Sequence, residues 1–291
     1  MKRKNPRTAT LLLVSLSLLW GCDPAKKPVP KVELPPVKAK ANFNMQTVVY
    51  RTVGDKNVEL DLYVPNPPQD AFRARPPRLV VLIHGGGWAS GSKEELNDLS
   101  EYFVGKGFAV ANINYRLAPE DIWPAMLEDC LAAVAYLRQH EADHGYDASR
   151  IIAGGESAGG HLSMWLAVKG QVSTVLSISG LHDLSLKMTP EGEKYKIVQK
   201  ALGKNYPADV RDFSPLNYVT SSLAPVYFIH GEKDPWVQFE HSARAESKLK
   251  SLGVRTKAVL VSGMGHGIKP KVATERKALD AFVAWASGEA P

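Results

Sequence analysis

Apolar and polar residues alternate along this chain in two recurring patterns. Short continuous apolar runs, such as residues 79–83, predict strands that are buried on both faces, as in the middle of a parallel sheet. Between these runs, apolar residues recur at spacings of three and four, as at Leu127, Leu131 and Val134, which predicts helices. This alternation predicts an α/β domain with a predominantly parallel central sheet flanked by helices. Strands are predicted at residues 79–83, 109–113, 151–152, 172–178, 225–229 and 257–261, and helices at residues 93–104, 124–139, 161–168, 239–252 and 272–285.

Two further features set the limits of this domain. A hairpin of residues 47–53 and 58–64, joined around Gly54, opens it near Phe43. Residues 181–222 lie between two predicted strands, and this polar stretch with three prolines is longer than a crossover needs. We therefore expect one domain over residues 43–291, in which residues 181–222 form a small lid over the strand ends.

The first residues have the composition of an export signal. Four basic residues within the first seven positions precede an apolar stretch, residues 11–20, that is too short to span a membrane. The next residues, Leu19-Trp20-Gly21-Cys22, resemble the lipobox of bacterial lipoproteins, with Trp20 as a bulky departure. The resemblance implies that residues 1–21 are a signal peptide and that Cys22 is lipidated; an ordinary signal peptide is the alternative. Lipidated Cys22 leaves Cys130 without a disulfide partner, so Cys130 is expected to be a small buried apolar residue.

A tether is predicted after the lipidated cysteine. Residues 22–42 are rich in proline and lysine and lack the apolar residues that a core requires, which predicts an extended linker. The lipid is therefore expected to hold the protein at a membrane of the bacterial cell envelope, facing the periplasm or the exterior. Asp23 resembles an inner-membrane retention signal, but the choice between inner and outer membrane stays open.

The positive charge of the chain lies in these N-terminal segments. The full sequence has a formal net charge of +6, whereas residues 1–40 carry nine basic and two acidic residues, a charge of +7. Residues 41–291 therefore have a net charge of −1. No basic patch with interleaved aromatic residues remains in them, so nucleic acid is not an expected partner.

Ser157 stands in the pattern Gly-x-Ser-x-Gly. The apolar pair Ile151 and Ile152 precedes this pattern, and a predicted helix follows it. A serine on a sharp strand-to-helix turn between glycines is typical of a nucleophile elbow. Its strained backbone lifts the hydroxyl above the sheet and aims a helix N-terminus at developing negative charge. The pattern alone also fits a small-residue turn that enters a helix, so the partners of the serine decide between the two.

Candidate partners of Ser157 follow the next strands. Asp234 comes after the strand at 225–229, and His266 comes after the strand at 257–261. Because the carboxyl ends of parallel strands share one edge of a sheet, the three side chains are expected to meet there. Histidine is the expected general base and Asp234 the acid that orients it. Glu232, two residues before Asp234, is the alternative acid.

A glycine run follows the strand at 79–83. The three glycines after His84 leave backbone N–H groups unobstructed, so that they can face an oxyanion. We assign the oxyanion hole to the N–H groups of Gly86, Gly87 and, from the elbow, Ala158, with the choice of two among the three glycines left open. His84 is expected to brace the glycine loop through hydrogen bonds.

These motifs together resemble those of carboxylesterases of the α/β-hydrolase superfamily over about residues 45–286. The similar branches are the hormone-sensitive-lipase-like one and the related one with feruloyl and acetylxylan esterases. The resemblance implies the α/β-hydrolase fold. Two features depart from the first branch: Asn114 replaces its usual aspartate, and no long cap helices precede the hairpin, which favours the branch with a small lid. The motifs that carry the resemblance are His84-Gly85-Gly86-Gly87-Trp88, Tyr115-Arg116-Leu117-Ala118-Pro119-Glu120, Gly155-Glu156-Ser157-Ala158-Gly159-Gly160, Asp234 in His-Gly-x-x-Asp-x-x-Val, and His266-Gly267.

The sequence thus predicts a serine carboxylesterase that hydrolyses a small-molecule ester through an acyl-enzyme on Ser157, with no cofactor and no metal. An amide or formamide, as in arylformamidase-like relatives, is the alternative substrate, and a non-catalytic binding lipoprotein on the same fold is the alternative from another class.

Trp88 and Trp236 adjoin these motifs and are expected to line the substrate pocket, with core packing as the alternative. A zinc site built from His84, His161 and His266 has no supporting ligand spacing. The sequence assigns neither an oligomeric state nor the acyl and alcohol parts of the substrate.

Overall fold

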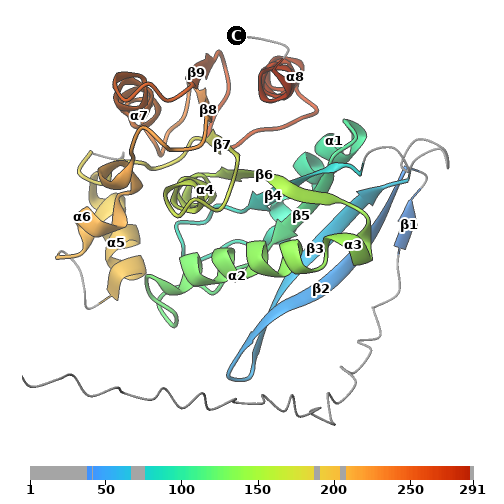
Figure 1. The fold of residues 1–291 in the computed structure, drawn as a ribbon. Helices are drawn as coiled ribbons and strands as arrows, with labels where there is room; N and C mark the ends of the chain where they lie inside the picture. The colour runs from blue at the N-terminus through green and yellow to red at the C-terminus, as the bar shows by residue number, and fades with distance from the viewer. Residues whose placement is uncertain (1–37, 41, 67–75, 187–190, 204–207, 289–291) are drawn as a thin grey trace, which may run out of the picture. The chain divides into compact units, whose positions relative to one another are not determined.

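One mixed sheet organises the part of the chain that the computed structural model describes, residues 38–40, 42–66, 76–186, 191–203 and 208–288 (Figure 1). Nine strands of these residues form it in the order β1-β2-β3-β5-β4-β6-β7-β8-β9. The three pairings from β1 to β5 are antiparallel, and the five from β5 to β9 are parallel. The predicted predominantly parallel sheet is therefore confirmed. The predicted signal peptide and Cys22 lie outside the described residues.

A long hairpin forms one side of the sheet. β2 (Phe43–Val53) and β3 (Lys56–Pro65) pair in an antiparallel manner, and Gly54 in the turn has a φ of 61°. β1 (Lys38–Lys40) pairs with β2 and begins the sheet earlier than expected, inside the range predicted as linker. An edge strand pairs through its backbone and needs no apolar pattern, so no local signal in the sequence predicts β1.

The parallel strands carry the loops that hold the candidate site. β6 is longer than predicted because it begins at polar residues, where Asp147 is opposite Arg78. The bounds are β4 (Arg78–Ile83), β5 (Ala109–Ile113), β6 (Asp147–Glu156), β7 (Thr174–Ile178), β8 (Val226–Gly231) and β9 (Thr256–Val261).

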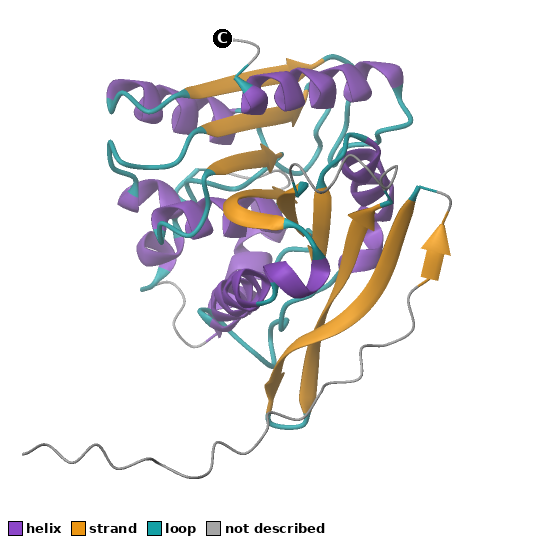
Figure 2. Ribbon diagram, turned by 45° about the vertical axis from the view of Figure 1, so that its right-hand side comes forward, coloured by secondary structure: helices purple, strands orange, loops and turns teal. Residues whose placement is uncertain are grey.

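Helices cover both faces of this sheet (Figure 2). Successive strand residues point to opposite faces, so Val81 of β4 belongs to the core cluster that includes residues of α2, α4 and α7. Leu82 belongs to the cluster on the other face, which includes residues of α1 and α8. Within the described ranges, no helix combines the length and the apolar character that crossing a membrane requires. The predicted helix at 93–104 divides into a 3₁₀ turn and a helix. The bounds are η1 (Lys93–Leu96), α1 (Asn97–Gly105), α2 (Ala125–Gln139), α3 (Glu141–His144), α4 (Ala158–Val168), α7 (Glu240–Ser251) and α8 (Ala273–Ser287).

In the described part of the range predicted as a lid, the chain forms α5 (Glu191–Leu202), α6 (Val210–Phe213) and η3 (Pro215–Tyr218) after β7. The backbone of α5 is fastened to the loop before α2, since the N–H of Trp123 donates to the carbonyl of Ala201 at 2.8 Å. The side chain of Ile197 packs against the glycine loop, where a Cβ added to Gly87 would lie 2.7 Å from Ile197 Cγ2. The helix α5 therefore lies over the carboxyl end of β4.

Candidate active site

Ser157 occupies a strained turn between β6 and α4. Its φ of 54° and ψ of −116° lie in a region that residues with a side chain rarely adopt. The turn is so tight that a Cβ on Gly159 would lie 1.9 Å from the carbonyl oxygen of Ile83. The N–H of Ser157 donates to the carbonyl of Ile178 at 2.8 Å, which fixes the turn against β7. The geometry is that of the strand-turn-helix elbow expected from the glycine pattern.

Asp234 and His266 lie on the loops that follow β8 and β9. His266 Nδ1–H donates to Asp234 Oδ2 at 2.8 Å, and Asp234 Oδ1 accepts the N–H groups of Trp236 and Val237, each at 2.9 Å. Burial raises the pKa of Asp234, but the hydrogen bonds from His266, Val237 and Trp236 outweigh it and hold the pKa at about 2. An anionic Asp234 keeps the proton on Nδ1 of His266, so Nε2 is the nitrogen available as a base.

A cavity of about 370 Å³ brings Ser157 and His266 together. Trp88 and Trp236 both line it but differ in exposure: Trp88 is fully buried, whereas Trp236 is 47% exposed at the surface. The indole N–H of Trp88 donates to His161 Nδ1 at 3.2 Å, and His161 Nε2–H donates to the carbonyl of Phe213 at 2.7 Å. Trp88 thus belongs both to the cavity wall and to the packed core, whereas the sequence presents these two roles as alternatives. The cavity is lined by Gly86, Gly87, Trp88, Ala89, Ser90, Ser157, Leu181, Ile197, Lys200, Trp236, Val237 and His266.

The glycine loop lines the same cavity. Gly86 and Gly87 have φ values of 92° and 58°, and a Cβ on Gly86 would lie 2.0 Å from the carbonyl oxygen of Ser90. Among the described residues, no hydrogen bond uses the N–H groups of Gly86, Gly87 or Ala158. Donors without a protein acceptor beside a strained serine are what an oxyanion hole requires.

His84 stabilises the glycine loop through a hydrogen bond and a ring contact. Its Nδ1–H donates to the carbonyl of Gly85 at 2.8 Å, and its ring stacks on Tyr115 at 4.3 Å between centroids. The hydroxyl of Tyr115 donates to the carbonyls of His84 and Gly85 at 3.1 and 3.0 Å. Burial lowers the pKa of His84 to about 4, so its ring is neutral near pH 7.

Glu232, the alternative acid, forms its hydrogen bonds with residues other than His266. Its Oε2 accepts the hydroxyl of Ser262 at 2.7 Å and the N–H of Gly263 at 3.1 Å, and its side chain is exposed. Glu232 therefore fastens the turn after β9, and Asp234 is the carboxylate that contacts His266.

The three histidines of the hypothetical zinc site have other partners. His84 and His161 bond to backbone carbonyls, and His266 bonds to Asp234. Within the described part of the chain, no group of three or more His, Cys, Asp or Glu side chains is placed to hold a metal ion.

Two residues beside the site had no role assigned from the sequence, the half-buried Glu156 and the buried His230. Glu156 precedes the serine, and its Oε1 accepts the N–H of Ile268, two residues after His266, at 2.7 Å. His230 lies behind Asp234: its Nε2–H donates to the carbonyl of Val237 at 2.8 Å and lies 3.5 Å from Asp234 Oδ2. The only sequence signal for a role of these two residues was their position. Glu156 directly precedes the serine, and His230 is the first residue of the motif that contains Asp234.

The sheet order, the strained turn at Ser157 and the loops after β8 and β9 define an α/β-hydrolase. Its sequence matches the profile of the BD-FAE family over residues 60–249, so the chain belongs to the BD-FAE family.

Similar proteins with known names include two from Mycobacterium tuberculosis. Esterase LipC is 27% identical over 236 residues, 71% of this chain and 58% of LipC, and carboxylesterase NlhH is 38% identical over 156 residues, 53% of this chain and 47% of NlhH. The chain therefore spans about half the length of these curated relatives. A solved structure titled bacterial heroin esterase superposes with a TM-score of 0.73 at 27% identity, covering 86% of both chains.

Proposed function

We propose that the protein hydrolyses carboxylic esters through an acyl-enzyme on Ser157. The observation that carries the proposal is the hydrogen bond of 2.8 Å between His266 and Asp234, beside a cavity that Ser157, His266 and the glycine loop line together. The names of the relatives, esterase and carboxylesterase, agree with this chemistry.

In the proposed reaction, His266 Nε2 takes the proton of Ser157 as its Oγ attacks the ester carbonyl carbon. The carbonyl π electrons move to the oxygen, which the N–H groups of Gly86, Gly87 and Ala158 stabilise. When the C–O bond to the alcohol breaks, His266 returns the proton to the leaving oxygen. A water molecule, deprotonated by His266, then attacks the acyl carbon. When the bond from this carbon to Ser157 Oγ breaks, His266 returns the proton to Oγ, and the acid is released.

The test is hydrolysis of short-chain nitrophenyl esters by the purified protein and its Ser157→Ala variant. We expect turnover by the native chain, none above background in the variant, and labelling of Ser157 by a fluorophosphonate probe. Unchanged turnover in Ser157→Ala contradicts the proposal. Turnover of formyl-kynurenine but not of esters favours the amide alternative, and absence of both turnover and labelling favours a binding protein.

We also propose that the protein works from a membrane of the cell envelope, held by a lipid on Cys22. The proposal is supported by the lipobox-like residues that precede Cys22 and the proline-rich stretch that follows it. Cells that express the full chain with radiolabelled palmitate should yield a labelled, membrane-bound protein. Cys22→Ser should abolish the label, and a label that persists in this variant contradicts the proposal.

A further inference from the structure

A second cavity of about 660 Å³ adjoins the one that contains Ser157. The two cavities share Ala89 and Lys200 in their walls, so they are neighbours across these residues. Its walls are more polar than those of the serine cavity, and we call it the polar cavity. The walls consist of the tip of the β2–β3 hairpin, the loop after β5, part of the segment after the glycine loop, and Lys200 of α5. The lining residues are Lys56, Asn57, Val58, Ala89, Gly91, Ser92, Asn114, Tyr115, Arg116, Leu117, Ala118, Pro119, Glu120, Asp121 and Lys200.

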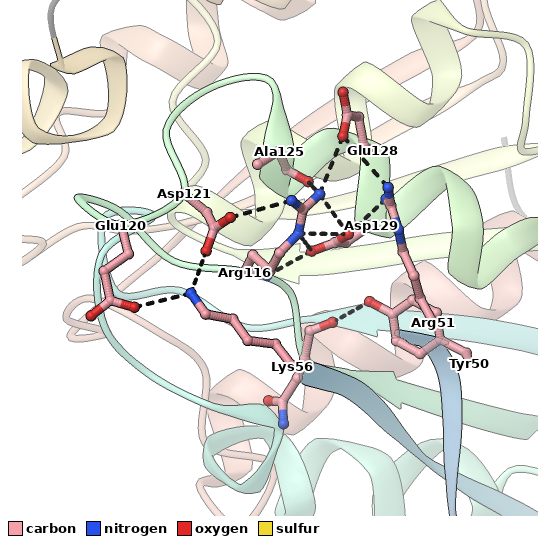
Figure 3. Close-up of polar contacts among 10 residues, drawn as sticks. Tyr50, Arg51, Lys56, Arg116, Glu120, Asp121, Ala125, Glu128 and Asp129 are labelled. Carbon is pink, nitrogen blue, oxygen red and sulfur yellow. Dashed lines mark hydrogen bonds and ion pairs between the residues drawn. The ribbon is translucent and has the colours of Figure 1, made fainter. Parts of the chain in front are cut away.

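Most charges in this polar cavity are paired with one another. Lys56 Nζ lies 3.1 Å from Glu120 and 2.8 Å from Asp121. Arg116 lies 3.3 Å from Asp121 and 2.8 Å from the buried carboxylate of Asp129 (Figure 3). These pairs join the hairpin, the loop after β5 and α2 into one wall, and they leave little charge for a ligand to neutralise.

Lys200 is different. No hydrogen bond or ion pair among the described residues involves its ammonium group, although it lines both cavities. The Lys200 side chain is exposed, but the backbone that carries it is held in place, because the next residue, Ala201, is fully buried and accepts the hydrogen bond from Trp123. Ile197, three residues earlier on the same face of α5, packs against Gly87. A cation without a partner therefore stands where the serine cavity meets the polar cavity.

We propose that the polar cavity binds a carboxylate-bearing part of the ester and that Lys200 pairs with this carboxylate. The inference rests on the proposed esterase activity and adds the class of substrate. The less polar cavity beside Ser157 takes the scissile group, and the negative charge extends past Ala89 into the polar cavity. A carboxylate suits the site because it supplies the one charge that the walls do not already balance.

Two matched pairs of esters test this proposal and distinguish the position of the carboxylate. The mono-para-nitrophenyl ester of adipic acid carries the charge on the acyl part, and its methyl para-nitrophenyl diester is the neutral match. The acetate ester of para-hydroxybenzoate carries the charge on the alcohol part, and its methyl ester is the neutral match. The measured quantity is the ratio of kcat/KM for the charged ester to kcat/KM for its neutral match.

We expect the native protein to favour the charged ester of one pair, by about fivefold for a partly exposed charge pair, and the preference to fall as salt rises. Lys200→Met should abolish the preference, Lys200→Glu should reverse it, and the neighbouring charge removal Lys196→Met should retain it. Activity on the neutral esters should persist in Lys196→Met. For the Lys200 variants, the ratio within each pair cancels any general effect on turnover, which separates this proposal from the esterase activity. The proposal is overturned if the native protein has a ratio of about 1 for both pairs, or if its preference for the charged ester survives in Lys200→Met. Absence of hydrolysis of every ester refutes the proposed function instead.

Discussion

The carboxylate of Glu156 accepts the backbone N–H of Ile268 at 2.7 Å and so ties the residue before the candidate nucleophile to the loop that carries His266. Burial raises the pKa of Glu156 from 4.5 to about 7, against the opposing effects of this hydrogen bond and of the nearby imidazole. The loop is close to the carboxylate, since a Cβ on Gly267 would lie 3.1 Å from Glu156 Oε2.

The raised pKa of Glu156 predicts a pH-dependent stability. Between about pH 4.5 and 7 the folded protein keeps a proton that the unfolded chain releases, so the free energy of unfolding falls as pH rises through this window. Glu156→Gln lacks this ionisation, and its stability relative to the native chain should rise by up to about 3 kcal/mol between pH 5 and pH 8. Urea unfolding of both proteins at the two pH values measures the difference.

The exposed Glu232 supplies the control for that experiment. Its hydrogen bonds with Ser262 and Gly263 lower its pKa, so its effect on stability is confined to pH values below about 4.5. Glu232→Gln should therefore show the same stability difference from the native chain at pH 5 and pH 8. An equally flat result for Glu156→Gln would show that Glu156 does not titrate in this window.

Asp234→Asn should lower kcat roughly 10⁴-fold, because an amide no longer enforces a proton on Nδ1 of His266. Steady-state hydrolysis of a nitrophenyl ester measures the effect, and circular dichroism checks that the variant is folded. In Glu232→Gln, kcat should change little, because that carboxylate bonds to Ser262 and Gly263. The opposite ranking of the two variants would make Glu232 the acid of the site.

Gly87→Ala should lower kcat by about 10²- to 10³-fold, the effect of losing one oxyanion donor. The added methyl group would meet Ile197, and a φ of 58° is strained for alanine. Adding Ile197→Ala removes the contact but not the strain, so it should restore only part of the activity. Full restoration by the double variant would mean that the glycine is required for space alone. Gly170→Ala serves as the matched control, because Gly170 also has a positive φ, 68°, and a Cβ added there would have no neighbour within 4 Å.

Asp129→Ala should destabilise the protein by about 3–5 kcal/mol, because it leaves two arginines without their shared buried partner. Asp129 is fully buried, and its carboxylate accepts Arg51 Nη1 at 2.7 Å, Arg116 Nε at 2.8 Å and the N–H of Arg116 at 2.8 Å (Figure 3). Glu120, whose side chain is 77% exposed, gives the comparison: Glu120→Gln should change stability by less than about 1 kcal/mol. Similar losses from both variants would contradict this assignment of the network.

The strand pattern and the motif residues were predictable because each rests on a local signal. Apolar runs mark β4, β5 and β8, and glycines mark the turns at Ser157 and at the loop after β4. β1 was not predictable, because backbone pairing at a sheet edge leaves no apolar pattern.

The shell around the candidate site was harder to predict, because it depends on contacts between distant segments. Glu156 and Ile268 are 112 residues apart, and Lys56 and Asp121 are 65 residues apart. The position of Lys200 between two cavities depends on how α5 packs on the loop before α2, and nothing in its local sequence indicates this.

The helix α5 contributes Ile197 and Lys200 to the cavity walls, whereas Ser157, Asp234 and His266 come from loops of the sheet. Separate stretches of the gene thus encode two sets of groups. One set is proposed to make and break bonds, and the other includes two side chains that are proposed to select the ester. On the proposed function, mutations in the segment between β7 and β8 would alter the ester that is accepted while the hydrogen bond between His266 and Asp234 keeps its geometry. Evolution of a new substrate preference would then require changes in this one segment only, and the proposed chemistry would be retained.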